Sequence, residues 1–593
     1  MYLFIEQKKA IIIRYYRKYR LIIVAIILMV CTMSFTQIST PRNIPRNIHR
    51  SSSLATGQIL FSPMVSSVTY LIDRNGNVNH TWPSGYFPGE AVYWLGDGTI
   101  LRAIRVGVSP GAGGVGGGVQ KIQWDGSITW DFRYNTNGYL SHHDIEPLPN
   151  GNVLMIAWET KTSAEAVAAG RNPSTISGNT LMPDHIIEVR PTGPTSGDIV
   201  WEWHVWDHLI QDYDSSKANY GIVADHPELV DINYVTASAG LSSDWLHCNS
   251  VDYHEAFDQI LISVHNFNEI WVIDHSTTSQ QAAGHTGGNS GKGGDILYRW
   301  GNPLAYQQGS SSDQQLFSQH DATWIAPGCP GDGNILMFNN GADRPGGSYS
   351  SVDEIVPPVN ATGHYTLEPG SAYGPASPLW SYTADPPSSF YASYISGAHR
   401  LPDGNTLICD GPAGRFFEVT PEKETMWQYI NPYPLMSLNN VFKICYIPAD
   451  APEASNLDCT GSLSWTNVHP GETVTGSFQV KNIGGSGSLL NWAVNVSSVD
   501  WGTWSFTPES EENLSPEDGF VMVQVSVVAP DQKNSKFEGY IQVVNQDDPN
   551  DFDVVPILLK TPMSLRQNAP VFSLVQHLLS FFPFFSMIYR LLQ

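Results

Sequence analysis

Histidine is the residue whose placement in this sequence most clearly indicates chemistry. The chain has 593 residues and 18 histidines. Four short phrases each place histidine just before or within a short apolar segment: SHHDIEPL (141–148), DWLHCNSV (244–251), SQHDATW (318–324) and SGAHRLPDGN (396–405). A single histidine in a strand is more often structural than catalytic, but its return at equivalent points of successive units favours a shared site. The candidates are His143, His247, His320 and His399.

Such histidines, with an arginine nearby, can do three kinds of chemistry. Neutral imidazoles can bind a metal ion. Arginine and imidazolium can hold an oxyanion without turnover. A histidine nitrogen can also act as a nucleophile, while a second histidine protonates the leaving group and arginine stabilises negative oxygens. Arg344, in FNNGADR, is the arginine that could reach the same region.

The sequence gives no clear signal for a metal or a cofactor. Its one HxxxH pair, His204 and His208, does not open a unit, and few carboxylates accompany the openings. We therefore assign no metal ligands and expect no cofactor. The histidines outside the openings are interpreted as structural; they are His80, His254, His265, His275, His285 and His364.

An internal repeat predicts the elements that position these histidines. A turn followed by a short apolar strand reads LGDGTILRA near residue 95, LPNGNVLMIA at 148, FDQILISV at 257, GDGNILMF at 331 and LPDGNTLICD at 401. Gly after Asp or Asn is typical of a hairpin turn, because such a turn needs positive φ. A more divergent unit at 58–82 brings the number to six. Repeated units of four short strands predict an all-β, six-bladed β-propeller over 58–450. A β-sandwich is the alternative, but it would not require the same phrase in successive units.

In a propeller the first strand of each blade lines the central channel, so histidines that open several blades should meet at one mouth of it. The repeat phrase is lost after Pro448. Alternating apolar segments over 451–562 predict a small immunoglobulin-like β-sandwich, for which a spacer or adhesion role is the default.

Both ends of the chain resemble targeting segments. Residues 1–40 hold a basic stretch followed by an apolar run, which is typical of a signal or anchor that exports the rest of the chain. Residues 41–57 are a linker, and the apolar tail at 563–593 is a second candidate for membrane contact. We therefore expect an extracytoplasmic protein, secreted or anchored to the outer face of the cell membrane.

Charge and cysteine content narrow the function further. The net charge of −25 argues against nucleic acid as a partner. Six cysteines without a CxxC pair argue against a zinc ribbon or a thioredoxin-like site. Five of the six could pair outside the cell, but their spacing does not give a connectivity.

In their order along the chain, DWLHCNSV, SQHDATW, FNNGADR and SGAHRLPDGN resemble the arylsulfotransferase family (aryl-sulfate sulfotransferases) over roughly residues 59–450. The resemblance implies a six-bladed propeller outside the cytoplasm. It also implies transfer of a sulfuryl group from a phenolic sulfate ester to a phenol, without a nucleotide donor and through a transiently sulfated histidine.

By motif order the resemblance gives the nucleophile role to His399, assisting roles to His247 and His320, and sulfuryl binding to Arg344. Asn249 and Asn339 are weaker candidates for polar contacts with the substrate. His143 is added from the blade pattern and not from the resemblance.

Two other functions remain open from the residues alone. One is a non-catalytic extracellular propeller that binds a ligand or a partner, because one fold hosts many functions. The other is a metal-dependent hydrolase or lactonase, which would need a stoichiometric metal ion.

Overall fold

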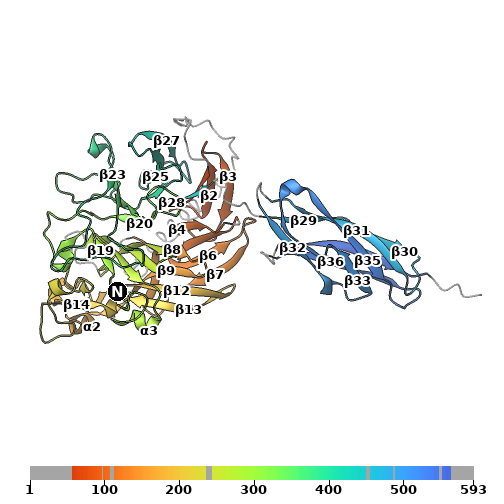
Figure 1. Ribbon diagram of the computed structural model, residues 1–593, viewed down its shortest axis with the longest axis horizontal. Coiled ribbons are helices and arrows are strands. Elements are labelled where there is room, and N and C mark those ends of the chain that lie inside the picture. The colour runs from red at the N-terminus through yellow and green to blue at the C-terminus, as the bar shows by residue number, and fades with distance from the viewer. Residues whose placement is uncertain are drawn as a thin grey trace, which may run out of the picture. The chain divides into compact units, whose positions relative to one another are not determined.

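The computed structural model describes residues 57–96, 98–106, 113–234, 243–448, 455–484, 488–546 and 551–562. These residues form an all-β protein, as predicted, with short helices such as α2 (Ser163–Ala168) and α3 (Ser279–Ala282) (Figure 1). The basic and apolar segment at 1–40 and the tail at 563–593 lie outside the described residues. Within the described ranges, no helix is both long and apolar enough to cross a membrane.

Residues 57–448 form six four-stranded antiparallel sheets, which confirms the predicted six-bladed β-propeller. From the channel outward, blade one has β28 (Val441–Pro448), β1 (Gly57–Pro63), β2 (Val68–Asp73) and β3 (Val78–Pro83), and blade two has β4 (Pro88–Trp94), β5 (Ile100–Arg105), β6 (Gly117–Ile122) and β7 (Ile128–Arg133). Blade three has β8 (Tyr139–Pro147), β9 (Val153–Glu159), β12 (Asp184–Gly193) and β13 (Ser196–His204), and blade four has β16 (Cys248–His254), β17 (Gln259–Val264), β18 (Glu269–Asp274) and β19 (Tyr298–Trp300). Blade five has β20 (His320–Trp324), β21 (Ile335–Asn339), β22 (Ser351–Ile355) and β23 (Trp380–Tyr382), and blade six has β24 (Gly397–Arg400), β25 (Thr406–Asp410), β26 (Arg415–Val419) and β27 (Thr425–Ile430).

The repeat phrase forms the same part of the five blades that carry it. Its turn joins the first and second strands, and its apolar residues are the second strand itself, as in β9, β17, β21 and β25. Every residue of these four strands is buried. Both faces of a middle strand pack against neighbouring blades, so these strands are apolar throughout instead of alternating. Two pairs of two-residue strands, β10 (Lys161–Thr162) with β11 (Thr180–Leu181) and β14 (Leu209–Ile210) with β15 (Val230–Asp231), lie in longer insertions between blade strands.

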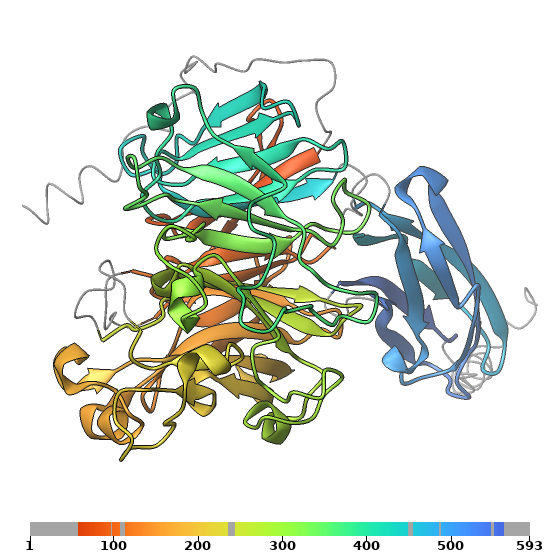
Figure 2. The same ribbon diagram turned by 60° about the vertical axis from the view of Figure 1, so that its left-hand side comes forward.

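The propeller is closed by strands from opposite ends of the domain. β28, the last strand, pairs with β1, the first, and places Cys445 opposite Leu60. Figure 2 shows a red strand of blade one among the cyan strands from the end of the propeller. The inner strands contact one another in the order β28, β4, β8, β16, β20 and β24, and β24 returns to β28. The blade-one unit at 58–82 therefore supplies three strands, and the C-terminal end of the propeller supplies its innermost one.

Residues 457–560 form a separate pair of sheets with its own core. One sheet has the order β29 (Leu457–Thr460), β31 (Thr473–Asn482), β35 (Phe520–Val528) and β33 (Thr503–Thr507). The other has the order β30 (Leu463–Thr466), β37 (Phe552–Lys560), β36 (Lys536–Asn545), β32 (Leu490–Asn495) and β34 (Ser510–Leu514). Phe478, Val525, Trp492 and Ile541 bring the two inner faces together in one cluster. The immunoglobulin-like type of this sandwich stays a prediction.

The cysteines of the described residues are free thiols: Cys248, Cys329, Cys409, Cys445 and Cys459.

Candidate active site

The backbone is irregular where several blades open onto the channel. The register of the inner strands shifts between Ser141 and Ile145, between Cys248 and Ser250, and between His320 and Thr323. At the same places His143, His247 and Asp321 adopt left-handed φ values of 51°, 54° and 50°. This conformation is unfavourable for residues other than glycine, and bulges beside functional sites often redirect side chains.

The irregular openings bring His143, His247 and His320 together, and a fourth histidine joins them. His265 begins η4 (His265–Phe267), directly after β17. The ring centroids are 4.5 Å apart for His143 and His247, 5.1 Å for His247 and His265, and 5.3 Å for His265 and His320. We call these four residues the histidine cluster. Sequence reasoning missed His265 because it follows a second strand and does not open a blade.

His247 is the member of the cluster that favours the charged form. Its Nδ1 lies 2.5 Å from Oδ2 of Asp244. Burial alone would lower the pKa of His247, but the Asp244 carboxylate outweighs burial and raises the pKa above its ordinary value. His247 can therefore carry a proton at neutral pH and give it to a bound group.

His320 is held neutral, in one tautomer. Its Nδ1 lies 2.8 Å from Oδ1 of Asn340 and 3.1 Å from the Ser318 carbonyl oxygen. The Asn340 amide nitrogen donates to the carbonyls of Ala392 and Ile395, so its oxygen must face His320. Both neighbours of Nδ1 are therefore acceptors, which places the proton on Nδ1 and a lone pair on Nε2. Burial, reinforced by the neighbouring imidazoles, holds the pKa of His320 well below its usual range.

His143 is a second neutral imidazole. His142 lies between it and Asp184, with Nδ1 2.8 Å from Nδ1 of His143 and Nε2 2.6 Å from Oδ1 of Asp184. The carboxylate accepts from His142, so His142 in turn accepts from Nδ1–H of His143. Burial lowers the pKa of His143 well below its ordinary value. Gly114 covers this ring, and a methyl group at that position would overlap the imidazole.

A carboxyl group that titrates near neutrality lies close to His247. Glu90 is 3% exposed and has a φ of 99°. Burial raises the pKa of Glu90 to about 7, against the opposing influence of Arg105 and His247. This end of the channel therefore combines neutral imidazoles, an imidazolium and a carboxyl group.

Lys443 and two aspartates form a buried layer within the channel. Nζ of Lys443 lies 2.8 Å from Oδ2 of Asp144 and 3.2 Å from Oδ1 of Asp321, and it donates to the hydroxyl of Tyr93. Burial opposes the charge on Lys443, but the two carboxylates prevail and raise its pKa. Lys443 directly follows Phe442, whose ring lies 6.3 Å from that of His320.

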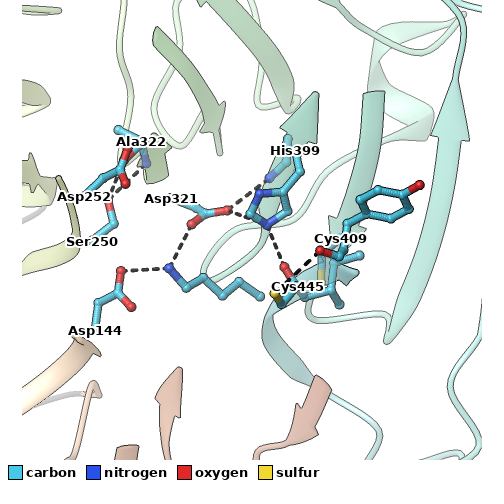
Figure 3. A network of polar contacts seen from close by, with 12 residues as sticks. Asp144, Ser250, Asp252, Asp321, Ala322, His399, Cys409 and Cys445 are labelled. Atoms are coloured by element: carbon cyan, nitrogen blue, oxygen red, sulfur yellow. Dashed lines mark hydrogen bonds and ion pairs between the residues drawn. The ribbon is translucent and has the colours of Figure 1, made fainter. Parts of the chain in front are cut away.

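His399 lies apart from the histidine cluster, beside this charged layer. Its Nε2 is 2.6 Å from the carbonyl oxygen of Ile444 and 3.9 Å from Oδ2 of Asp321. In Figure 3 Asp321 lies between Asp144 and His399. His399 lines a cavity of about 190 Å³ together with residues near the far ends of the inner strands, such as Trp324. Trp324 is the last residue of β20, whereas His320 is its first.

Two cations, Lys443 and Arg400, line the cavity at His399 together with carboxyl groups. Glu146 and Asp252 line the same cavity. Burial raises the pKa of Asp252 to about 7 and the pKa of Glu146 well above its ordinary value. Lys443 is paired with Asp144 and Asp321, and Arg400 with Glu354, so both cations of this cavity are already engaged by carboxylates.

The remaining candidates lie in and around blade five. The Arg344 guanidinium is 3.0 Å from Oγ of Ser351 and packs over the rings of Tyr349 and Phe317, with Phe317 three residues before His320. Asn249 donates to the Gln319 carbonyl at 2.8 Å, and Oδ1 of Asn339 accepts from the Phe317 amide at 3.0 Å. Both buried amides brace the segment that leads into His320.

The histidine cluster does not have the geometry of a metal centre. Among the described residues, three ligand atoms from His, Cys, Asp or Glu come within 4.8 Å of one another elsewhere, at His208, His285 and Asp295.

The sequence of this chain matches a known protein family. The family model described as arylsulfotransferase (ASST) matches residues 59–433. No curated protein matched the chain.

Among solved structures, the chain is similar to a protein of unknown function from Bacteroides caccae, with 11% identity, a TM-score of 0.36, and coverage of 66% of this chain and 99% of that one. It is also similar to virginiamycin B lyase from Staphylococcus aureus, with 11% identity, a TM-score of 0.30, and coverage of 65% and 83%. These similarities are too weak to carry an argument about function.

Proposed function

Because the chain belongs to the arylsulfotransferase family, whose members transfer a sulfuryl group between aryl compounds, we propose that the histidine cluster performs this transfer through a covalent intermediate on His320. The observation that carries the assignment is the fixed tautomer of His320. Two acceptors hold the proton on Nδ1, so Nε2 offers a lone pair without prior deprotonation.

In the first half-reaction, Nε2 of His320 forms a bond to sulfur, and the bond from sulfur to the aryl oxygen breaks. The departing oxygen takes a proton from the His247 imidazolium. A free phenol has a pKa of about 10, so its anion is a good leaving group once a proton is supplied. In the second half-reaction a new phenol gives its proton to His247, its oxygen attacks sulfur, and the N–S bond breaks. This order predicts ping-pong kinetics and needs no nucleotide donor.

Charge favours the histidine cluster over the cavity at His399 as the place of sulfuryl transfer. The donor ester and the sulfuryl oxygens are negative, and a protonated His247 offers them a positive partner. The family resemblance implies that Arg344, which lies on the same blade as His320, binds the sulfuryl group. By contrast, the cations that line the His399 cavity, Lys443 and Arg400, already pair with buried carboxylates, and Nε2 of His399 is hydrogen-bonded to the Ile444 carbonyl. We therefore propose His320 in place of His399 as the nucleophile.

Transfer from a chromogenic aryl sulfate to a phenol tests this assignment. We expect His320→Ala to lose at least a thousandfold in kcat, because the covalent route is removed, and His399→Ala to keep activity within about tenfold. His364→Ala, at an exposed histidine of a blade-five loop, is the matched control. Full activity in His320→Ala, or loss of activity in His399→Ala alone, would contradict the proposal.

We also propose that the propeller works outside the cytoplasm. The basic stretch and apolar run at 1–40 support this location. Fractionation of cells that express the full chain tests it: activity on a donor that does not cross membranes is expected with intact cells.

A further inference from the structure

Three ligand atoms converge far from the channel, at the outer part of blades three and four. Nδ1 of His208 and Nδ1 of His285 lie 2.9 Å and 2.7 Å from the same oxygen, Oδ1 of Asp295. His208 follows η2 (Val205–Asp207), directly after β13 of blade three. His285 and Asp295 lie in the insertion between β18 and β19 of blade four, after α3.

Both ring nitrogens of His208 face oxygen atoms. The side chain is fully buried, and its Nε2 lies 2.8 Å from the Ala282 carbonyl oxygen, which can only accept. In the neutral imidazole the proton is therefore on Nε2, and Nδ1 presents a lone pair. Nδ1 faces a carboxylate oxygen at 2.9 Å, and either a second proton or a metal ion can bridge these two atoms. Nδ1 of His285 approaches the same carboxylate oxygen, so the three atoms surround a position that a metal ion can occupy.

The setting of His208 is also typical of a metal ligand. Metal-binding histidines commonly donate their second ring N–H to a carbonyl, which fixes the tautomer and the ring orientation. The Trp203 ring stacks on His208 with an interplanar angle of 12°, and its indole N–H donates to the Gly294 carbonyl. Gly294 directly precedes Asp295, so the same contacts orient two of the three ligands.

We propose that His208, His285 and Asp295 bind one divalent ion of the zinc type, with water in the fourth position. Two imidazole nitrogens and one carboxylate oxygen are ligands that zinc accepts. Tetrahedral coordination at bond lengths of about 2.0–2.1 Å places ligand atoms ~3.3 Å apart. Oδ1 of Asp295 would therefore move ~0.4 Å farther from Nδ1 of His208 and ~0.6 Å farther from Nδ1 of His285 than the present 2.9 Å and 2.7 Å. The exposed fraction of the His285 side chain is 60%, so the ion can enter from solvent.

The ion would tie the insertion of blade four to the outer edge of blade three. The HxxxH pair of the sequence contains the proposed ligand His208, but its other member, His204, is not a ligand. The ring of His204 stacks on His185 and contacts Glu159, away from this group. His285 shows no motif in the sequence, because its partners come from segments about 75 and 10 residues away and only the fold unites them.

Element analysis of the purified full chain tests the site. The protein is stripped with a chelator, dialysed against Zn²⁺ and then against metal-free buffer. We expect one zinc per wild-type chain, less than a tenth of that in His285→Ala, and strongly reduced binding in Asp295→Asn. His364→Ala, also an exposed histidine, should retain one zinc. His285→Ala is the most informative variant, because an exposed side chain contributes little to folding.

Two further measurements keep the outcome decisive. Cobalt in place of zinc should give the intense visible bands of tetrahedral coordination in wild type and lose them in His285→Ala. Zinc should raise the unfolding temperature of wild type but not of that variant. A wild type that keeps no metal after dialysis, or equal zinc in wild type and both variants, would overturn the proposal. Sulfuryl transfer is not the readout, so the result is independent of the proposed function.

Discussion

At the residue scale, the candidate site depends on neighbouring histidines that are held in different protonation states. Asp244 keeps a proton on His247, whereas burial and two acceptors keep His320 neutral. The sequence predicted His247 and His320 by their phrases. It could not predict their states, which depend on Asn340 and on neighbouring rings from other blades.

The pH dependence of transfer follows from these states. The pKa of His247 is raised, so its acid form is present below that pKa and is lost as pH rises through it. We expect kcat/KM to fall on the alkaline side, and the fall to begin at lower pH in Asp244→Asn, which removes the charge that raises the pKa. Asn340→Asp, which changes the partner of His320 instead, serves as the comparison. If the alkaline fall of kcat/KM stays at the same pH or moves to higher pH in Asp244→Asn, His247 is not the acid.

Lys443 makes the clearest prediction about stability. Lys443→Met leaves Asp144 and Asp321 buried without their cation, so the free energy of unfolding should fall by about 3–5 kcal/mol. Arg190→Met breaks an exposed pair with Asp198 and should cost no more than ~1 kcal/mol. Denaturant unfolding followed by tryptophan fluorescence measures both. Equal stability of the two variants would show that the buried layer contributes little.

At the element scale, the strands that carry the repeated phrase were predicted from the sequence, and the strand without it, β28, was not. The turn-and-strand phrase located the second strand of five blades, because a hairpin turn and a fully buried strand leave a strong local signal. β28 carries no such phrase, and its partner β1 lies almost 400 residues away. His399 was placed with the other histidines by its phrase. In blade six, however, the left-handed residues are Ile395 and Ser396, so His399 lies three residues farther along the strand than Ser396.

Closure by β28 can be tested by truncation. We expect a fragment of residues 57–448 to fold, because it contains all six blades. A fragment that ends at residue 440 lacks the innermost strand of blade one and exposes the apolar edge of β1, so it should aggregate or unfold at lower temperature. Solubility and circular dichroism of the two fragments measure this. Equal folding of both would contradict closure by this strand.

At the scale of the whole molecule, the chain combines two all-β parts with separate cores. The cluster, the charged layer and the candidate metal site all lie within the propeller, so the 57–448 fragment should retain sulfuryl transfer. Fold class and blade number were predictable from the sequence because they rest on repetition. The site was predictable only in part, because it depends on where each strand begins along the channel.

The most direct test of the central claim is the mass of the protein after exposure to a chromogenic aryl sulfate without an acceptor. A sulfuryl group bound to nitrogen adds about 80 Da, the mass of SO3. Peptide mapping should place this mass on the peptide that contains His320, and His320→Ala should remain unlabelled. Labelling of the His399 or His143 peptide instead, or turnover in His320→Ala, would contradict the account.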